Sequence, residues 1–293
     1  MDTVIIKACL NGGRGREENP HVPWSPQEVA EEAVRCFNAG ASIVHFHGRT
    51  AQGGINYDPA WYTEADRLIR ERCDLVLNHT TIRQANVPVE TVIRYLRETP
   101  SPVDMVSVNL GYFISWRQDS TSQERQTVVI PNSYEDIRAT VAACYSRGIY
   151  PEPTVQDLGT LNNAITLVRD GVFRRSDYFL LEPGGDWGHG RQFAPGTPRN
   201  YFALTQAVRE FFPNALLIAH GSGLQTFTIG AFAIATGDHL RVGFEDSPRT
   251  PTNPQPRSSA EFVEWAAALA RLHGREPATP RQARDLLHLP LTA

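Results

Sequence analysis

Eight short apolar or β-branched segments are spread along this chain of 293 residues, and stretches with helical spacing lie between them. Strands are predicted over 4–9, 43–47, 75–78, 105–108, 152–156, 178–182, 216–220 and 240–244. Helices are predicted over 26–38, 59–72, 89–97, 133–147, 162–169, 199–211 and 224–235. Strands that alternate with helices form parallel sheets, and eight parallel strands close into a barrel. We therefore predict an α/β fold, a (β/α)8 TIM barrel, with a doubly wound open sheet as the alternative.

The last part of the chain, about 258–293, holds two further helical stretches, 258–273 and 280–288. The first supplies an eighth helix, and the second belongs to a C-terminal extension. The length alone would allow two domains, but barrels of this kind reach the same size as one. We expect 1–293 to form a single barrel domain that carries this extension.

Composition limits the class of protein. Hydrophobic residues make up 41% and charged residues 20%, which is enough apolar material for a full core. The formal net charge of -4 comes without a basic block, so neither nucleic acid nor an anionic membrane is indicated as a partner. No apolar run approaches the roughly 18 residues of a membrane span, and no signal peptide is recognised. The cysteines show no CxxC spacing: Cys9, Cys36, Cys73 and Cys144. We expect a cytoplasmic small-molecule enzyme with reduced thiols.

The segment "SIVHFHGRT" carries two histidines at the end of a predicted strand. Side chains alternate along a strand, so His45 and His47 point the same way, as two ligands of one metal ion would. Neutral imidazole suits zinc, and a catalytic zinc takes three protein ligands and keeps one position open. Glu245, just after another predicted strand, is the strongest candidate for the third ligand. Two alternatives stay open: another divalent ion, and a pair of histidines bonded to backbone groups.

Polar side chains gather where the predicted strands end, which is the catalytic face of such a barrel. They are Asn11, Arg14, His45, His47, Asn78, His79, Thr80, Thr81, Asn109, Gln156, Asp157, Glu182, His220, Ser222, Glu245 and Asp246. In a closed barrel the second and eighth strands both flank the first, which brings the two histidines and Glu245 within reach of one ion. This distribution favours the metal site over structural histidines.

The chain resembles the β-keto acid cleavage enzymes over nearly its whole length. The resemblance is carried by "NPHVPWSPQEVAEEAVRCFNAGASIVHFHGRT", "PVDMVSVNLG", "DLGTLNNA", "HLRVGFED" and "GREPATPRQARDLL". The HxHxR and RVGxED elements together are specific. The resemblance implies a zinc-dependent barrel that assembles as a homotetramer. It also implies a reaction in which a β-keto acid and acetyl-CoA become acetoacetate and a new acyl-CoA.

The same resemblance implies residue roles. His45, His47 and Glu245 would hold the zinc ion, which acts as a Lewis acid and lowers the cost of forming an enolate. Asp246 would take a proton from the carbon between the carboxylate and the ketone, and Arg241 would pair with this base. Arg241 precedes Glu245 by four residues, and this even spacing places it on the same face of the strand.

Substrate contacts are predicted from Asn11, Arg14, His79, Thr80, Asn109 and Glu152. Arg14 stands where family members that act on an amino substrate have a glutamate, so its cation favours a neutral or anionic β-keto acid unless it points to solvent. His79 lies near a position at which the family usually has a residue with a small hydroxyl group. His79 either hydrogen-bonds the substrate carboxylate, joins a proton relay or has a structural role. Thr154 replaces the second acid of a Glu-x-Glu segment that keeps Glu152.

The sequence suggests possible roles for two loops near the predicted site. "SPRTPTNPQPRSS" is predicted to form no strand and to cover the site, reach a neighbouring subunit or simply be solvated. "EPGGDWGHGRQFAPGTP" is interpreted as a flexible lid whose glycines let the backbone approach CoA phosphates.

Two other functions remain as alternatives. A metal-dependent retro-aldol or Claisen lyase would use the same enolate chemistry without acetyl-CoA. A non-catalytic protein that binds a CoA ester or keto acid would need no base, so the presence of Asp246 and Arg241 argues against it.

Overall fold

Eight parallel strands close into a barrel in the order β11-β12-β2-β3-β4-β5-β8-β9. This computed structural model describes residues 2–100, 103–118, 124–184, 190–191 and 194–290. The barrel strands are β2 Ile6–Cys9, β3 Ile43–Phe46, β4 Val76–Thr80, β5 Met105–Asn109, β8 Tyr150–Val155, β9 Tyr178–Leu181, β11 Leu216–Ala219 and β12 His239–Val242. Each overlaps one predicted strand, so the predicted barrel is confirmed and the open sheet is wrong.

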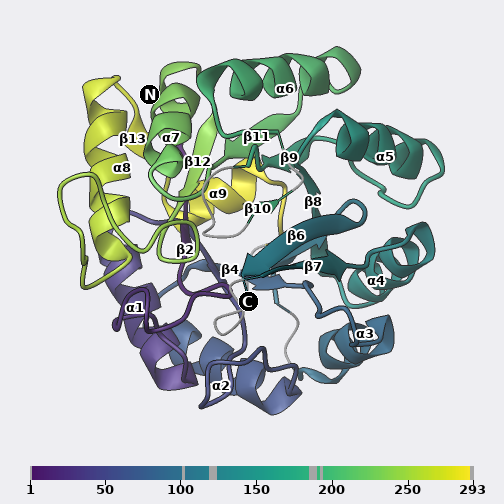
Figure 1. Ribbon diagram of the computed structural model, residues 1–293. Coiled ribbons are helices and arrows are strands. Elements are labelled where there is room, and N and C mark those ends of the chain that lie inside the picture. Colours follow the sequence, from purple (N-terminus) through teal and green to yellow (C-terminus); the bar gives the residue numbers. More distant parts are fainter. Residues whose placement is uncertain (1, 101–102, 119–123, 185–189, 192–193, 291–293) are drawn as a thin grey trace.

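Helices cover the outside of the barrel (Figure 1). They are α1 Pro26–Ala39, α2 Pro59–Arg70, α3 Val89–Glu98, α4 Tyr134–Ser146, α5 Leu158–Arg169, α6 Pro198–Phe211, α7 Gln225–Ala235 and α8 Ala260–Leu272. Local signals set their ends: Ser25 and Glu28 form a capping box at the start of α1. Helix α5 begins at Leu158 rather than at the predicted 162, because the side chain of Asp157 accepts from the Thr160 N–H and caps it.

Helix α9, Pro280–Leu286, closes the end of the barrel opposite the strand carboxyl ends. In the view of Figure 1 it lies across the centre of the barrel. Ala283 and Leu287 are buried in one cluster with Ile5, Ile43 and other side chains from the starts of the strands. The extension therefore completes the core at this end of the barrel.

A small antiparallel sheet was not predicted. It consists of β6 Phe113–Gln118, β7 Arg125–Ile130 and β10 Gly190–Arg191, in the order β10-β6-β7. Figure 1 shows β6, β7 and β10 over the barrel opening. A second short pair joins β1 Thr3–Val4 to β13 Glu276–Pro277 in parallel, so the predicted first strand is split. The split falls at Ile5, whose N–H donates to His239 Nδ1 (3.0 Å).

The Pro-rich segment 247–259 forms no strand, as predicted. Asn19 Nδ2 donates to the carbonyl oxygens of Pro248 (3.1 Å) and Pro256 (2.9 Å), which ties the segment to the N-terminal loop. The predicted glycine-rich lid, 182–198, lies partly outside the described residues, at 185–189 and 192–193. Within the described ranges, the helices are all too short or too polar to cross a membrane.

Candidate active site

A cavity of about 450 Å³ opens where the carboxyl ends of the barrel strands meet. Residues from several strands line it, among them His45, His47, Thr80, Asn109, Arg241 and Glu245. This is the face on which the chemistry of a parallel barrel is expected.

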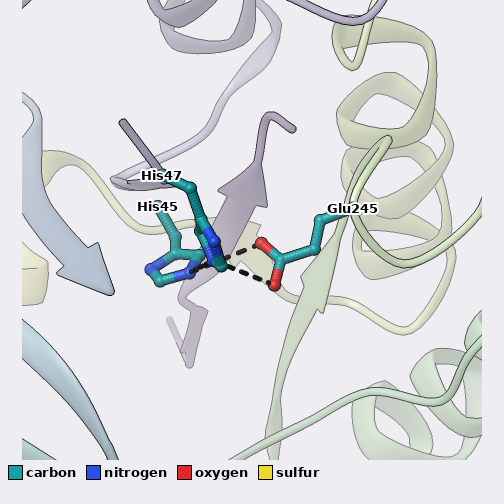
Figure 2. Close-up of side chains that lie close together, drawn as sticks. All are labelled: His45, His47 and Glu245. Carbon is teal, nitrogen blue, oxygen red and sulfur yellow. Dashed lines mark hydrogen bonds and ion pairs between the residues drawn. The ribbon is translucent and has the colours of Figure 1, made fainter. Parts of the chain in front are cut away.

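Three predicted metal ligands face one another in this cavity (Figure 2). His45 Nε2 lies 3.2 Å from His47 Nε2 and 3.4 Å from Glu245 Oε2, and His47 Nε2 lies 3.4 Å from the other carboxylate oxygen, Oε1. Tetrahedral zinc, with bonds of about 2.0–2.1 Å, separates its ligand atoms by about 3.3–3.4 Å. The three side chains lie close enough together to hold one metal ion, with one ligand atom from each within 4.8 Å of the others.

The protonation states of His45 and Glu245 suit a metal as well. Burial, which is the largest effect, lowers the pKa of His45 well below its usual value, so the imidazole is neutral. Burial opposes ionisation of Glu245, but Arg241 and then the two histidines hold the pKa of this carboxyl well below its usual value. Glu245 Oε2 is buried and accepts no hydrogen bond from the described residues. A neutral imidazole and an ionised carboxylate are donors that suit zinc.

Two glycines allow the chain to place Glu245. Gly243 has φ +145°, and a Cβ there would lie 2.2 Å from the carbonyl oxygen of Cys9. Gly12 has φ +49°, and its Cβ would lie 2.2 Å from Glu245 Cγ. The segment after β12 therefore packs directly on the end of β2 and carries Glu245 toward the histidines.

A chain of buried hydrogen bonds orients His45. Its Nδ1 lies 2.6 Å from Asn78 Oδ1, and Asn78 Nδ2 donates to Glu152 Oε2 (3.1 Å). Lys7 Nζ donates to the same Glu152 oxygen (2.6 Å), and the Tyr178 hydroxyl donates to the other. A carboxylate only accepts, so Glu152 fixes the Asn78 amide with its oxygen toward His45. His45 must then carry its proton on Nδ1, which leaves the Nε2 lone pair for a metal.

Glu152 thus supports a ligand and does not line the cavity. Asn11, also predicted as a substrate contact, holds the backbone of His47 in a similar way. Its Oδ1 accepts from the His47 N–H (2.9 Å), and its Nδ2 donates to the His47 carbonyl (3.0 Å). Both Asn11 and Glu152 are fully buried.

Arg14 is buried beside the cavity and does not line it. Its Nε donates to the carbonyl of Glu245 (3.1 Å), and its Nη2 donates to the carbonyl of Asp246 (3.2 Å). Its Nη1 pairs with Glu18 at 2.5 Å. The guanidinium therefore holds the backbone that carries Glu245 and Asp246.

Arg241 and Asp246 form a buried pair beside the metal ligands. Arg241 Nη2 lies 2.7 Å from Asp246 Oδ1 and 2.8 Å from Glu245 Oε1. His220 Nδ1 lies 3.2 Å from Asp246 Oδ1. Burial raises the pKa of Asp246, but Arg241 and then His220 outweigh it and lower this pKa below its usual value. Arg241 lines the cavity, whereas Asp246 is fully buried against the Arg241 side chain.

The remaining predicted contacts divide in two. Thr80 and Asn109 line the cavity. His79 faces away from it, toward α2, where its Nε2 lies 2.8 Å from Asp66 Oδ1 and its ring packs 4.6 Å from that of Tyr62. The alternation along β4 explains this, because Thr80 faces the cavity and its neighbour His79 must therefore face the helices.

Sequence reasoning assigned no role to Arg49, the arginine of the HxHxR element, which lines the cavity and is only 4% exposed. Its Nη1 donates to the carbonyl of Gly12 (2.5 Å), and its Nε donates to that of Gly53 (2.9 Å). None of its hydrogen bonds within the described part of the chain goes to a carboxylate. Its place two residues after His47 was the available signal.

The fold and the site define an α/β-barrel enzyme with a candidate metal site. The family model of the beta-keto acid cleavage enzymes matches residues 3–289, so the chain belongs to this family. This membership confirms the predicted family and the predicted C–C bond-cleaving acyltransferase class.

Relatives of known name match this chain over nearly its full length. The chain is 29% identical over 291 residues to the 3-keto-5-aminohexanoate cleavage enzyme of Fusobacterium nucleatum subsp. nucleatum, covering 99% of each chain. It is 26% identical to the 3-oxoadipate:acetyl-CoA acetyltransferase of Cupriavidus necator, covering 98% of this chain and 95% of the relative. Among solved structures, the apo structure of ObcA has a TM-score of 0.74 at 17% identity, covering 92% of this chain and 66% of that one. The last likeness concerns the fold alone.

Proposed function

We propose that this protein is a zinc-dependent enzyme that converts a β-keto acid and acetyl-CoA into acetoacetate and a new acyl-CoA. The observation that carries the proposal is the shared cavity of the ligand triad and Arg241, with Asp246 buried directly against Arg241. The names of relatives that use acetyl-CoA as co-substrate support the second substrate.

Asp246 takes the proton from the substrate carbon between the carboxylate and the ketone. Arg241 pairs with Asp246 and keeps the Asp246 carboxylate ionised. Because Arg241 lines the cavity and Asp246 lies behind it, the reacting carbon has to approach beside this guanidinium. A zinc ion held by His45, His47 and Glu245 would act as a Lewis acid toward the keto oxygen. The charged guanidinium of Arg241 meets negative charge that develops beside it.

The reaction proceeds through two acyl transfers, in which each bond that forms replaces one that breaks. The deprotonated carbon attacks the acetyl carbonyl of acetyl-CoA, and the CoA thiolate leaves. The thiolate then attacks the former ketone carbon, the carbon–carbon bond breaks, and the proton held by Asp246 passes to the departing acetoacetate.

The test measures acetoacetate and acyl-CoA formed from β-keto acids, with and without acetyl-CoA, before and after chelation and zinc return. We expect turnover that requires acetyl-CoA, stops on chelation and returns with zinc. Turnover without acetyl-CoA would make the protein a lyase. Ligand binding without turnover at full zinc occupancy would make it a sensor.

The homotetramer implied by the family resemblance stays a prediction. A mass measurement in solution tests it, with four times the chain mass of 32.6 kDa as the expected result.

A further inference from the structure

The two sides of the cavity differ in character. The metal ligands come from β3 and from the end of β12, which flank β2 on either side. In the closed order of eight strands, β8 lies opposite β2, and β5 and β9 lie beside β8. If the proposed function holds, the keto and carboxylate oxygens of the substrate lie at the metal side. The rest of the substrate, its tail, then extends toward the wall formed by β5, β8 and β9.

The β6–β7 hairpin turns an apolar face into this part of the cavity. Phe113 pairs with Ile130 and Ser115 pairs with Val128, and paired residues of an antiparallel ladder share a face. All four line the cavity: Phe113, Ser115, Val128 and Ile130. Leu180 of β9 also lines it. The hairpin and Leu180 therefore give this wall an apolar face, which lies beside the polar lining residues Ser107, Asn109, Thr154 and Glu182.

Several polar groups of this wall are already bonded to the protein. Gln156 Nε2 donates to Asn109 Oδ1 (2.9 Å) and to Glu182 Oε2 (3.4 Å). The guanidinium of Arg83, at the rim, pairs with Asp136. Glu182 and Arg83 thus both already have partners within the protein.

One polar atom of the wall is different. Thr154 Oγ1 is buried, belongs to a residue that lines the cavity, and has no hydrogen-bond partner among the residues that the structure describes. A buried hydroxyl without a partner is unfavourable, and a ligand oxygen would satisfy it. It offers one neutral hydrogen bond, not a charge.

We propose that this wall selects β-keto acids with an uncharged, mainly aliphatic tail, of which Thr154 can bind one oxygen atom. A charged tail would lose its hydration against Phe113, Val128 and Ile130 without gaining a counter-ion. An aliphatic tail instead buries apolar surface there. This inference rests on the proposed function, and it replaces the expectation drawn from Arg14, which lies outside the cavity lining.

The first experiment compares three acids with six-carbon chains: 3-oxohexanoate, 3-oxo-5-aminohexanoate and 3-oxoadipate. The readout is kcat/KM for acetyl-CoA-dependent acetoacetate formation by the zinc-loaded enzyme. We expect the uncharged acid to exceed both charged acids by at least about tenfold. A charged acid that is turned over best would overturn the selection by this wall and leave the proposed function intact. Turnover of none of the three would count against the proposed function as well.

The second experiment uses matched variants of the hairpin. Val128 faces the cavity, whereas its neighbour Val129 lies on the opposite face and is 38% exposed. Val128→Thr keeps the shape and adds a hydroxyl, so we expect KM for 3-oxohexanoate to rise about three- to tenfold with kcat little changed. Val129→Thr should leave both constants unchanged. Equal effects of the two variants would show a merely structural role and overturn the proposal.

The third experiment adds a charge to the wall. Thr154→Glu places a carboxylate beside the tail. We therefore expect the ratio of kcat/KM for 3-oxo-5-aminohexanoate to kcat/KM for 3-oxohexanoate to rise by at least about tenfold. Thr154→Val, which is isosteric, should leave the preference for an uncharged tail in place. An unchanged ratio in the folded, zinc-loaded Thr154→Glu variant would show that the tail does not lie at this wall.

Discussion

The guanidinium of Arg241 donates to both carboxylate oxygens of Asp246, with Nε 3.1 Å from each oxygen and Nη2 2.7 Å from Oδ1. A planar guanidinium that meets a carboxylate in this way fixes both its position and its charge. Because Arg241 also reaches Glu245 Oε1 at 2.8 Å, one cation orders the candidate metal ligand Glu245 and its neighbouring carboxylate together.

Asp246→Asn should abolish proton abstraction and leave the metal in place. An amide is no base, so we expect kcat to fall by about 10²- to 10⁴-fold. The specific readout is exchange of the substrate protons between carboxylate and ketone with deuterated water, in the absence of acetyl-CoA. We expect this exchange to be lost while zinc content is unchanged. Exchange at the normal rate would rule out Asp246 as the base.

Glu152→Gln should weaken metal binding without touching a ligand. The amide of Gln can donate to Asn78 and so removes the constraint that turns Asn78 Oδ1 toward His45. Loss of such an outer hydrogen bond to a ligand costs about 10- to 100-fold in metal affinity. Competition with a chromophoric zinc chelator measures this affinity.

The matched control for that variant is Asp66→Asn. Asp66 is also buried and bonded to a histidine, His79, but this pair joins α2 to β4 on the outside of the barrel. We expect Asp66→Asn to lower stability and leave zinc affinity unchanged. Equal losses of zinc affinity in both variants would reduce the role of Glu152 to general stability.

Gly12→Ala should displace Glu245. Its Cβ would lie 2.2 Å from Glu245 Cγ, and its φ of +49° adds strain for any side chain. Gly148→Ala is the control, because Gly148 has φ +70° but nothing within 4 Å of its Cβ. Both variants should lose about 1 kcal/mol or more of stability, and Gly12→Ala alone should lose zinc. Retained zinc in Gly12→Ala would show that this contact does not place the ligand.

His239 should make the fold less stable in acid. Burial, and then Arg275, lower the pKa of His239 to about 3, so it is neutral in the folded protein at pH values where the unfolded chain is protonated. Stability from this residue is complete above the unfolded pKa of about 6.5 and is lost as the pH falls toward 3.

At about pH 5 this loss amounts to about 2 kcal/mol. The measurement is urea unfolding at about pH 7.5 and pH 5 for the wild type and for His239→Asn, which keeps an acceptor for the Ile5 N–H. The wild type should lose more stability than the variant between the two values. Equal losses would mean that His239 does not titrate on unfolding in this range.

The barrel and the positions of the candidate ligands could be predicted from the sequence because both follow from local patterns. Eight apolar segments at helix-spanning intervals predict a parallel barrel, and the spacing of His45 and His47 places both on one face of a strand. The same alternation, applied to Asn78 and Thr80, would have turned His79 toward the helices. That error came from reading the strand end as a loop.

Other features were decided only by the tertiary structure. Whether Arg14 contacts a substrate or two backbone carbonyls depends on how the segment after β12 packs on the loop after β2. Arg14 and Glu245, which meet there, are 231 residues apart in the sequence. Glu152 was predicted to contact substrate, but Lys7 and Tyr178 from other strands surround it with donors away from the cavity lining. Local sequence patterns fix which face a side chain takes, because backbone geometry is periodic. They do not fix its partners across the barrel, because those depend on register and packing between distant segments.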